Sequence, residues 1–399
     1  MIKGKMRVLM IVQSIYLNDP RVRREAELLA REGCRVDVVS LRNEQEPFLR
    51  IVNNVRIYGI KLGRRYGSKF RYLYEYAAFQ VLAAFLTVRL TLVHRYDLVQ
   101  IHNLPDTLIF CALFPKLLGA KAVFDAHEAM PESLRIKYGL SEESRTTRCL
   151  KILERFCMSL ADHVLTIHEP IRQLFISRGI PAGKISVVMN LPDPGLFRPL
   201  CDKPAERPLR TEFALIYAGT IAERYGLQTA IKALPLLRAD IPGIRFQVYG
   251  KGDFQAPLER LAVELDVRDR VFFKSPVPHS DMAAVYGSAD IGISPHENDL
   301  FGDIYFSTKV AEYMACGLPV IVSRTRVMNH YYTDSQVAFF SPGDYNDFAK
   351  RVFDIYLNPV YRRQLIQNGL KLCEEWSWAQ EGRNYIDALG KFGRRRLLS

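Results

Sequence analysis

The sequence lacks the cysteine patterns that stabilise small secreted domains or bind zinc. No C-x-x-C pair occurs, and the seven cysteines are far apart. They are Cys34, Cys111, Cys149, Cys157, Cys201, Cys316 and Cys373. Because the count is odd and the spacings are wide, the pattern indicates neither a disulfide framework nor a zinc site. A reducing cytoplasm is the compartment that fits best.

The sequence also lacks an apolar leader and a long uninterrupted apolar run. Residues 1–5 lead directly into the strand-like run Met6–Val12, so no signal peptide is apparent. The apolar run Ala77–Val88 is too short to cross ~30 Å of hydrocarbon. Gln80 and Arg89 interrupt or flank this run. The sequence therefore predicts no transmembrane helix.

Negative charge is scarce relative to positive charge. The chain has 55 Lys and Arg against 43 Asp and Glu, for a formal net charge of +12. This excess favours an anionic partner, which composition alone leaves open among a nucleotide, a nucleic acid and a membrane surface. The cations are spread along the chain and no recognised nucleic-acid-binding module occurs, so we expect no nucleic-acid partner.

What the chain has is a globular composition and a regular alternation of strands and helices. Its 399 residues are 48% hydrophobic and 25% charged, which is typical of two to three folded domains. In the first half the expected strands are Met6–Val12, Val36–Leu41, Asp97–Ile101, Lys121–Phe124, Val164–Ile167 and Ile185–Met189, and the expected helices are Arg21–Arg31, Thr107–Leu118 and Thr146–Leu160. Such alternation predicts an α/β domain with a mostly parallel sheet.

A second alternating unit follows a break in the pattern. Residues 190–210 contain five prolines and little apolar periodicity, which is a linker composition. Beyond it the expected strands are Ala214–Tyr217, Arg245–Tyr249, Val271–Phe273, Ile291–Ser294 and Val320–Ser323, the expected helices are Leu227–Leu237, Ala256–Leu265, Ser280–Gly287 and Thr308–Cys316, and the chain from Tyr361 onward reads as mostly helical. Two doubly wound domains of this kind bind ligands at the carboxyl ends of their strands.

The most informative segment is Phe306–Val320, which reads F-S-T-K-V-A-E-Y-M-A-C-G-L-P-V. It predicts a loop, a short helix, a glycine stop and a strand. The N–H groups that begin such a helix attract anions, and Lys309 adds a positive charge beside them. Glu312 follows one turn later, where it can accept hydrogen bonds from a ribose. Taken alone, Ser307 and Thr308 are also consistent with an ordinary helix cap, and Glu312 with a surface residue.

This segment resembles the donor site of the retaining glycosyltransferases of the GT-B fold, specifically family 4, which typically carry N/T-K-x-x-E-Y-M-A-x-G-x-P-V. The resemblance extends along essentially the whole chain. It includes Asn18–Ala26 (an acceptor-side loop and helix), Phe124–Glu128 (an interdomain histidine motif), Tyr217–Thr220 and Tyr249–Gly252 (donor-side glycine turns) and Trp376–Trp378 (a closing tryptophan motif).

The resemblance implies two Rossmann-like domains that face a cleft. The first spans residues 1–200 on the acceptor side, the second spans 210–375 on the donor side, and 376–399 packs back on the first. It implies transfer of a sugar, with retention, from a nucleotide-diphosphate sugar to an acceptor hydroxyl without a metal or other cofactor. Consistent with this, no D-x-D motif stands at a predicted strand end.

Site residues follow from the resemblance position by position. The catalytic set is His127, Arg224 and Lys309; the donor-binding set is Gly219, Thr220, Gly250, Gly252, Val277, Ser307, Thr308 and Glu312; the acceptor-side set is Asp19, Arg21, His102 and Asn103. No metal ligands are expected. A histidine after a strand is, by itself, more often structural than catalytic, and glycine turns by themselves are weak signals.

Three positions depart from the family pattern. The carboxylate expected eight positions before Glu312 is Ile304, with Asp303 beside it and Glu297 further back. The family's Arg and Lys after the first glycine turn are replaced by Thr220 and Tyr225, with Arg224 one position away. These departures affect the expected sugar contacts more than the expected diphosphate site.

Two other classes of protein remain compatible with the sequence. One is a sugar-nucleotide epimerase of the same fold, and the other is a non-catalytic binding or partner subunit. Release of nucleoside diphosphate that is stimulated by an acceptor would distinguish a transferase from both.

The segment Leu62–His94 combines cations and aromatic residues before its apolar run, including Arg64, Arg65, Tyr66, Lys69, Phe70, Arg71, Tyr72 and Tyr74. It is consistent either with an amphipathic helix on an anionic membrane or with a core helix that has a solvated end. We expect a protein at the cytoplasmic face of the membrane, acting on a lipid-linked or polysaccharide-precursor glycan.

Overall fold

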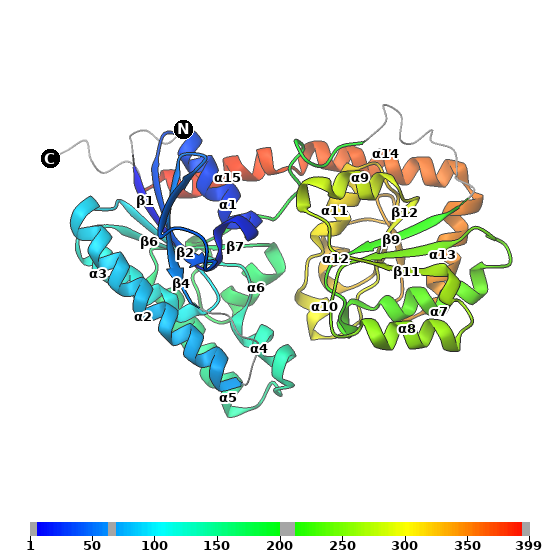
Figure 1. Cartoon of the computed structure of the whole chain (residues 1–399), viewed down its shortest axis with the longest axis horizontal. Coiled ribbons are helices and arrows are strands. Elements are labelled where there is room, and N and C mark those ends of the chain that lie inside the picture. The colour runs from blue at the N-terminus through cyan, green and yellow to red at the C-terminus, as the bar shows by residue number, and fades with distance from the viewer. Residues whose placement is uncertain (1–5, 63–68, 200–211, 393–399) are drawn as a thin grey trace. The chain divides into compact units, whose positions relative to one another are not determined.

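The computed structural model describes residues 6–62, 69–199 and 212–392, with side chains in the second helix described from Tyr74 onward. Two compact units are present, and each is described by itself. The first comprises the described residues up to Asn190 together with those from Glu381 onward, and the second is Leu191–Gln380. Figure 1 shows a central sheet with helices on its faces in each unit. The expected α/β class with two doubly wound sheets is confirmed.

The first unit contains an eight-stranded sheet in the order β3-β4-β2-β1-β5-β6-β7-β8. The strands are β1 (Arg7–Ile15), β2 (Arg35–Arg42), β3 (Leu49–Val52), β4 (Val55–Lys61), β5 (Leu98–His102), β6 (Lys121–Ala126), β7 (His163–Thr166) and β8 (Ile185–Val187). Only β3, at one edge, is antiparallel to its neighbour among these pairs. The apolar runs in β1, β5 and β6 are buried because helices cover both faces of this sheet.

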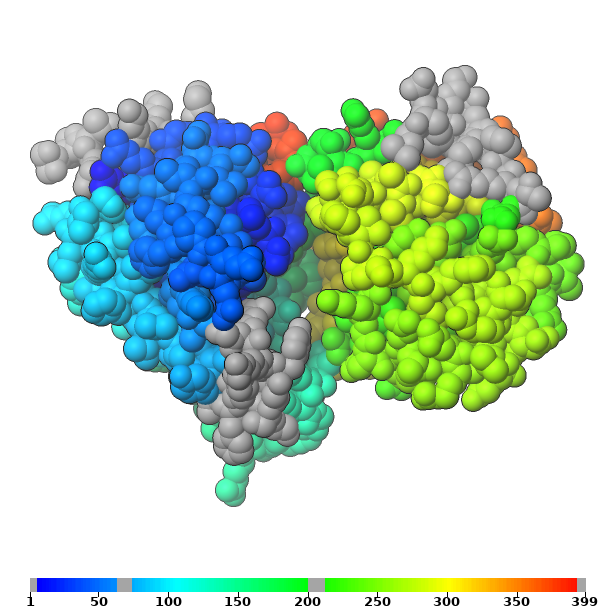
Figure 2. Space-filling view, in the orientation of Figure 1, coloured from blue at the N-terminus to red at the C-terminus, as the bar shows by residue number. Residues whose placement is uncertain are grey.

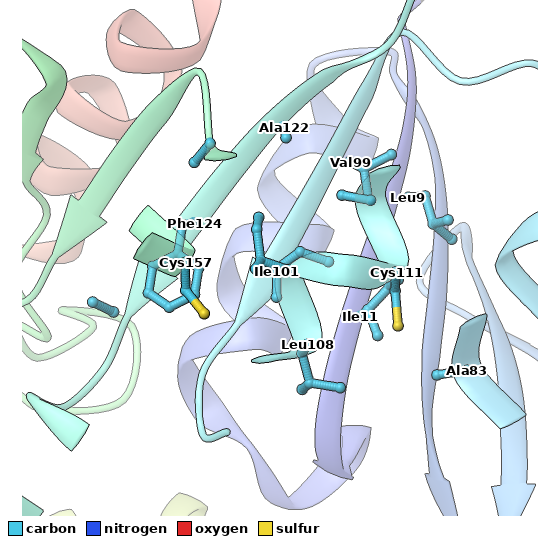
Figure 3. Packing of buried hydrophobic residues seen from close by; sticks show 14 of the residues in the cluster. Leu9, Ile11, Ala83, Val99, Ile101, Leu108, Cys111, Ala122, Phe124 and Cys157 are labelled. Atoms are coloured by element: carbon cyan, nitrogen blue, oxygen red, sulfur yellow. The ribbon is translucent and has the colours of Figure 1, made fainter. Parts of the chain in front are cut away.

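The helices of the first unit are α1 (Pro20–Arg31), α2 (Lys69–His94), α3 (Leu113–Leu117), α4 (Met130–Tyr138), α5 (Arg145–Leu160), α6 (Glu169–Ser177) and the end of α15 (Trp378–Gly390), with a 3-10 helix η2 (Asp106–Ala112) before α3. Helices α2, η2, α5 and α6 supply side chains to one core cluster. In Figure 3, Ala83 of α2, Leu108 of η2 and Cys157 of α5 pack against the strands of the sheet.

The second unit contains a six-stranded parallel sheet in the order β11-β10-β9-β12-β13-β14. Its strands are β9 (Ala214–Ala218), β10 (Arg245–Tyr249), β11 (Val271–Lys274), β12 (Ile291–Ser294), β13 (Val320–Ser323) and β14 (Ala338–Phe340). Its helices are α7 (Leu227–Leu237), α8 (Gln255–Glu264), α9 (Met282–Gly287), α10 (Leu300–Ile304), α11 (Thr308–Ala315), α12 (Arg326–Tyr331), α13 (Tyr345–Leu357) and α14 (Pro359–Glu375), with a short 3-10 turn η5 (Glu223–Tyr225).

The unit boundaries differ from the ranges expected from the sequence. Leu191–Pro199 and Trp376–Gln380 belong to the second unit. Local contacts explain this, since the Trp378 backbone N–H donates to the Pro192 carbonyl at 3.1 Å, and the Phe197 ring stacks on that of Tyr286. Residues 200–210 of the expected linker lie outside the described residues.

Two local expectations were wrong. The helix expected over Thr107–Leu118 is a 3-10 helix followed by a short α-helix. Pro115 explains the break, because proline lacks the N–H that a continuous helix would need there. The run Ala77–Val88, expected to be too short to cross a membrane, is the middle of a longer helix, α2, which has 26 residues. Within α2, Tyr74–His94 is long and apolar enough to cross a membrane by length and composition. One third of its most apolar 18-residue stretch is buried inside the protein.

Candidate functional site

The predicted site residues fall into two groups, one in each unit. In the first unit, His102 ends β5, and His127 follows the end of the neighbouring strand β6. The carboxylate of Asp125 lies between them, with its Oδ2 3.0 Å from His102 Nδ1 and 2.9 Å from His127 Nε2. The two imidazoles are themselves 3.1 Å apart at these nitrogens. His102 and Asp125 are fully buried, whereas the His127 side chain is 20% exposed.

Arg21 closes this cluster from α1. Its Nη2 donates to Asp125 Oδ1 at 2.6 Å and its Nε donates to Asp125 Oδ2 at 3.0 Å. Its Nη1 donates to the Val188 carbonyl at 2.7 Å. Asp19 caps α1 by accepting the Val22 N–H, and its charge contributes to raising the pKa of His127. Arg21, expected on the acceptor side, is therefore buried and already paired, and its position orients Asp125.

The pKa values of the two histidines in this cluster are shifted in opposite directions. Burial alone would lower the pKa of His127, but the charge of Asp125 and their hydrogen bond raise that pKa above its ordinary value. Burial lowers the pKa of His102 despite the same carboxylate. Burial would raise the pKa of Asp125, but Arg21 and His127 hold it well below its usual range. His127 is thus the histidine of this pair that is poised to carry a proton.

A second layer of hydrogen bonds fixes the loops around the cluster. Asn103 accepts the His127 backbone N–H at 2.8 Å and donates to the Glu128 carbonyl at 2.8 Å. Its side chain also donates to Asp106 at 2.9 Å. Asn103 therefore acts in this structure by holding the loop that presents His127. The Glu128 carboxylate accepts a hydrogen bond from Ser133, which braces the same loop.

The cluster continues through buried polar residues to the C-terminal helix. Arg21 Nε is also 3.2 Å from Glu25 Oε1, and Gln100 donates to the other oxygen of Glu25 at 2.7 Å. The Tyr385 hydroxyl of α15 donates to Gln100 Oε1 at 2.6 Å. Burial, reinforced by the charge of Asp125, raises the pKa of Glu25 to about 8. Sequence reasoning missed Asp125, Gln100 and Tyr385 because their pairing is long-range, and it also missed Glu25, which pairs locally with Arg21.

The imidazoles and Asp125 also have the geometry of a small cation site. One donor atom from each of His102, Asp125 and His127 lies within 4.8 Å of the others. Arg21 occupies both oxygens of Asp125, however. A metal ion would have to displace or oppose a buried guanidinium, so these residues fit a metal poorly.

In the second unit, the predicted donor motif forms the start of α11. Ser307 stands at the N-cap position, but its side chain makes no capping hydrogen bond. The simple capping interpretation of Ser307 is therefore not what the structure shows. Thr308 begins the helix and is half-buried. Lys309 in the first turn places Nζ 3.3 Å from Glu312 Oε2, at a partly exposed site.

Glu312 is buried on the inner side of α11 and has a partner that the sequence did not suggest. The Tyr286 hydroxyl of α9 donates to Glu312 Oε2 at 2.7 Å. The charge of Glu312 adds to burial in raising the pKa of Tyr286 well above its ordinary value, so this phenol stays protonated. A carboxylate offers about four acceptor positions, so Glu312 can still accept hydrogen bonds from a ligand.

The two glycine turns pack against each other. A Cβ on Gly250 would lie 1.8 Å from the Gly219 carbonyl oxygen, and one on Gly252 would lie 1.9 Å from that of Ile221. The Gly219 N–H donates to the Tyr249 carbonyl at 2.9 Å. These glycines are thus required for backbone to approach backbone, and Thr220 at the tip of the first turn is exposed. Val277 is half-buried in the loop after β11.

Arg224 lies in the turn η5 against aromatic rings. Its guanidinium carbon is 5.0 Å from the Phe301 ring centroid and 5.5 Å from that of Tyr225. Within the described part of the chain, its buried Nε has no hydrogen-bond partner. Tyr225, which replaces the family's Lys, is surrounded by the rings of His296, Phe301 and Tyr305. Contact with these rings positions the one cation of this turn.

The structure also shows where the residues upstream of Glu312 that depart from the family pattern lie. Ile304 ends the short helix α10, and Asp303 is exposed. Glu297 lies beside Arg224, since its backbone N–H donates to the Arg224 carbonyl at 3.2 Å. Gln228 donates to the Glu297 carboxylate at 2.7 Å, and burial raises the pKa of Glu297. A carboxylate is therefore present near this turn, although not at the spacing that the family pattern prescribes.

Comparison with known proteins agrees with this geometry. A family model described as "Glycosyl transferase 4-like domain" matches residues 19–190, and one described as "Glycosyl transferases group 1" matches residues 202–372. Together they cover most of both units. The chain is a family-4-like glycosyltransferase of the GT-B fold.

Individual relatives of this glycosyltransferase are distant. It is 28% identical to a D-inositol 3-phosphate glycosyltransferase of Corynebacterium glutamicum (strain R), over 74% of this chain and 72% of that protein. It is 22% identical to a phosphatidylinositol N-acetylglucosaminyltransferase protein of Arabidopsis thaliana, over 82% and 72% of the two chains.

Solved structures share the fold of this glycosyltransferase. The sucrose-phosphate synthase of Thermosynechococcus elongatus superposes with a TM-score of 0.78 at 19% identity, covering 97% of this chain and 99% of that one. The catalytic domain of starch synthase IV of Arabidopsis thaliana, bound to ADP and acarbose, gives 0.72 at 15% identity, covering 98% and 100%.

Proposed function

We propose that this glycosyltransferase moves a sugar, with retention of anomeric configuration, from a nucleotide-diphosphate sugar to an acceptor hydroxyl. The observation that carries the proposal is the arrangement around α11. An uncapped helix start, Lys309 and a buried acceptor, Glu312, occur within a single turn. This combination suits a nucleoside diphosphate, because the helix start and lysine attract phosphates and the carboxylate accepts from a ribose.

The chemistry that these residues would perform is mainly electrostatic. Negative charge grows on the leaving diphosphate as the bond to the sugar breaks, so fixed positive charges at that place lower the barrier. Lys309, the start of α11 and Arg224 are the groups proposed for this role. His127, whose pKa is raised by the charge of Asp125 and their hydrogen bond, is proposed to contact the transferred sugar and stabilise charge there. The proposal requires no metal or other cofactor.

The acceptor is proposed to be a lipid-linked or polysaccharide-precursor glycan, or a related polyol headgroup. The relatives named for inositol phosphate and phosphatidylinositol support this class of acceptor. We also propose that the protein works at the cytoplasmic face of the membrane. Arg64, Arg65, Tyr66 and the side chains of Lys69–Leu73, on which the sequence argument relied, lie outside the described side chains.

The experiment is a turnover screen of the purified chain. UDP-, GDP- and ADP-sugars are incubated with and without phosphatidylinositol or inositol phosphate, and products are followed by mass spectrometry. We expect one donor to release its nucleoside diphosphate faster with acceptor, and NMR to show the donor's anomeric configuration in the product. Lys309→Met should reduce this turnover, whereas Lys350→Met, on the exposed part of α13, should not.

Other outcomes of the screen contradict the proposal. An epimerised sugar nucleotide formed without acceptor would identify an epimerase instead. Binding without turnover of any donor would indicate a non-catalytic binding protein, and an inverted anomeric centre would disprove retention.

A further inference from the structure

Helix α2 is apolar on all sides, but only one side of it is packed. Phe79, Ala83 and Leu90 are buried in the core of the first unit. On the opposite side, Val81, Phe85 and Leu92 expose 67%, 71% and 67% of their surface. A helix that is hydrophobic all round normally has a partner on every side. The outer side of α2 therefore lacks a partner within the described chain.

The neighbouring helices extend this unpartnered side. On α3, Leu117 is 84% exposed, and on α5, Ile152 and Phe156 are 69% and 51% exposed. The three helices form one layer. Gln80 of α2 accepts a hydrogen bond from Thr107 of η2, Phe110 of η2 packs on Phe156 of α5, and Lys116 of α3 donates to the Leu160 carbonyl. In Figure 2, α2 and α3, coloured blue to cyan, form part of the outer surface of this unit. We call the exposed side of α2, α3 and α5 the outer layer.

The charges on the outer layer have one sign. Arg89 of α2 and Arg148 and Arg155 of α5 are exposed among its apolar residues. Between Tyr76 and His94, and throughout α3, the sequence has no carboxylate. The carboxylates of the two flanking elements, Asp106 and Glu154, are buried. The outer layer is thus both apolar and cationic. A surface of this kind complements an anionic lipid bilayer, which offers both hydrocarbon and phosphate groups.

One end of α2 also lies near the carboxyl ends of the strands of the first unit's sheet, which is where His127 is found. Helix α2 follows β4 and ends where Arg7 of β1 donates to the His94 carbonyl. Its opposite end lies near the carboxyl end of β1, where Gln13 donates to the Glu75 carbonyl at 3.4 Å. A surface that contacts the outer layer would therefore extend to the strand ends from which His102 and His127 project.

We propose that the outer layer is a docking surface for an anionic lipid bilayer, on which α2 lies in the interfacial plane. The helix does not cross the bilayer, because its inner side is part of the core and leaving it would expose Phe79 and its neighbours. Apolar side chains of α2, α3 and α5 enter the headgroup region while the arginines contact lipid phosphates. This inference rests on the proposed function only in explaining why a lipid-linked acceptor would be near.

Vesicle flotation of the full chain tests the docking surface without any donor or acceptor. The probe is a vesicle of phosphatidylcholine with 30% phosphatidylglycerol, compared with phosphatidylcholine alone. We expect binding to the anionic vesicle that weakens at high salt and is lost at alkaline carbonate. The variant Val81→Ser/Phe85→Ser/Leu92→Ser should bind at least tenfold more weakly. Changing Arg89, Arg148 and Arg155 to Ser should weaken binding roughly fivefold per arginine.

A matched control uses the second unit. Val263, Leu357 and Val360 are about as exposed as the three residues changed on α2, at 63%, 69% and 65%. Val263→Ser/Leu357→Ser/Val360→Ser should bind vesicles as the wild type does, and circular dichroism should show that both triple variants are folded. The fluorescence of the tryptophan introduced by Phe85→Trp should be quenched by brominated lipids, whereas that introduced by Val263→Trp should not.

Three results would overturn the docking surface. These are a wild type that stays unbound at low salt, an α2 triple variant that binds as well as the wild type, and a wild-type dimer that only the α2 variant converts to monomer. The last result would show that a second copy covers the layer. Failure here with normal transfer to a soluble acceptor would leave the proposed function intact. Vesicle binding by a chain that transfers no sugar would support the docking surface and contradict the proposed function.

Discussion

The charged residues of the two units are arranged in opposite ways. In the first unit, Arg21, Asp125 and the two histidines satisfy one another inside the protein. In the second, Arg224 rests on aromatic rings without a carboxylate contact in the described chain, and Lys309 has one longer contact at a partly exposed site. In the first arrangement the Arg21 guanidinium is paired with a buried carboxylate, although His102 Nε2 has no hydrogen-bond partner in the described chain, whereas the second arrangement leaves the Arg224 guanidinium without such a partner. The comparison is consistent with the proposal that the second unit binds the anionic donor and the first unit orients groups beside it.

The largest expected effect is on the first unit's cluster. Asp125→Asn breaks the buried pair with Arg21 and leaves that guanidinium with Glu25 as its remaining carboxylate neighbour, so we expect the free energy of unfolding to fall by ~3–5 kcal/mol. Chemical denaturation of the full chain measures this change. Lys309→Met is the matched change in the second unit and should cost at most ~1 kcal/mol, because the pair it breaks is partly exposed. Equal losses in the two variants would remove the contrast between the units.

The same variant has a pH signature. The pKa of His127 lies above its ordinary value, so the stability that its proton contributes is complete below about pH 6.5 and is lost as pH rises through the raised pKa. In Asp125→Asn this contribution should disappear, and the His127 ring signals should titrate at lower pH by NMR. Asp37→Asn on β2, which breaks the partly buried pair with Arg56 of β4, should leave the His127 titration unchanged.

The next effect is on turnover in the second unit. Neutralising Lys309 or Arg224 should lower turnover by ~10²–10³-fold, in the range seen when a charge-stabilising donor is removed. Donor affinity should change less, because the charge on the leaving group grows toward the transition state. Steady-state kinetics with the donor found by the screen, together with calorimetry, separate the two quantities. Variants with full turnover would place the diphosphate elsewhere.

Glu312 should affect binding rather than turnover. Glu312→Ala removes a charged acceptor and is expected to weaken nucleotide-sugar binding by ~1.5–3 kcal/mol. Tyr286→Phe keeps the Glu312 carboxylate but removes the hydroxyl that donates a hydrogen bond to it. The affinity of that variant for the nucleotide sugar should therefore be nearly unchanged. Calorimetry on both folded variants gives the answer. Unchanged affinity in Glu312→Ala would rule out the ribose contact.

The smallest expected effect is at the C-terminal helix. Tyr385→Phe deletes the hydroxyl that donates to Gln100, and should lower the free energy of unfolding by ~0.5–1.5 kcal/mol. Tyr345→Phe, at a more exposed position on α13, is the control and should change little. An unchanged free energy of unfolding in Tyr385→Phe would mean that the buried hydrogen-bonded residues from Gln100 to Asp125 do not depend on α15.

Local sequence patterns predicted most of the fold because they describe local structure. The bounds of α7 and β10 agree with their apolar periodicity, and glycine and proline marked several ends. The hairpin β3–β4 was missed because its strands are short and its turn, Asn53–Asn54, gave a weak signal. The break between η2 and α3 was missed because apolar spacing outweighed one proline.

The candidate site was less predictable because its contacts join distant parts of the chain. Periodicity could place His102 and His127 after strands, but nothing local pairs Arg21 with Asp125. Tyr286 was not assigned a role because a phenol on a short helix looks like a core residue. Glu25 did carry a signal, since it lies four residues after Arg21 on the buried side of α1. Read together, those two charges could have indicated a buried polar cluster.

The first unit contains residues that precede the second unit in the sequence and residues that follow it, so it can be completed only after the second unit has been translated. Glu381, Tyr385 and Lys391 supply partners to the Met189 N–H, Gln100 and His163, which are translated much earlier. A nascent chain that has emerged only as far as Asn190 lacks these partners, so its polar interior is unfinished. Helix α15, which is translated after almost all of the second unit, therefore completes the first unit.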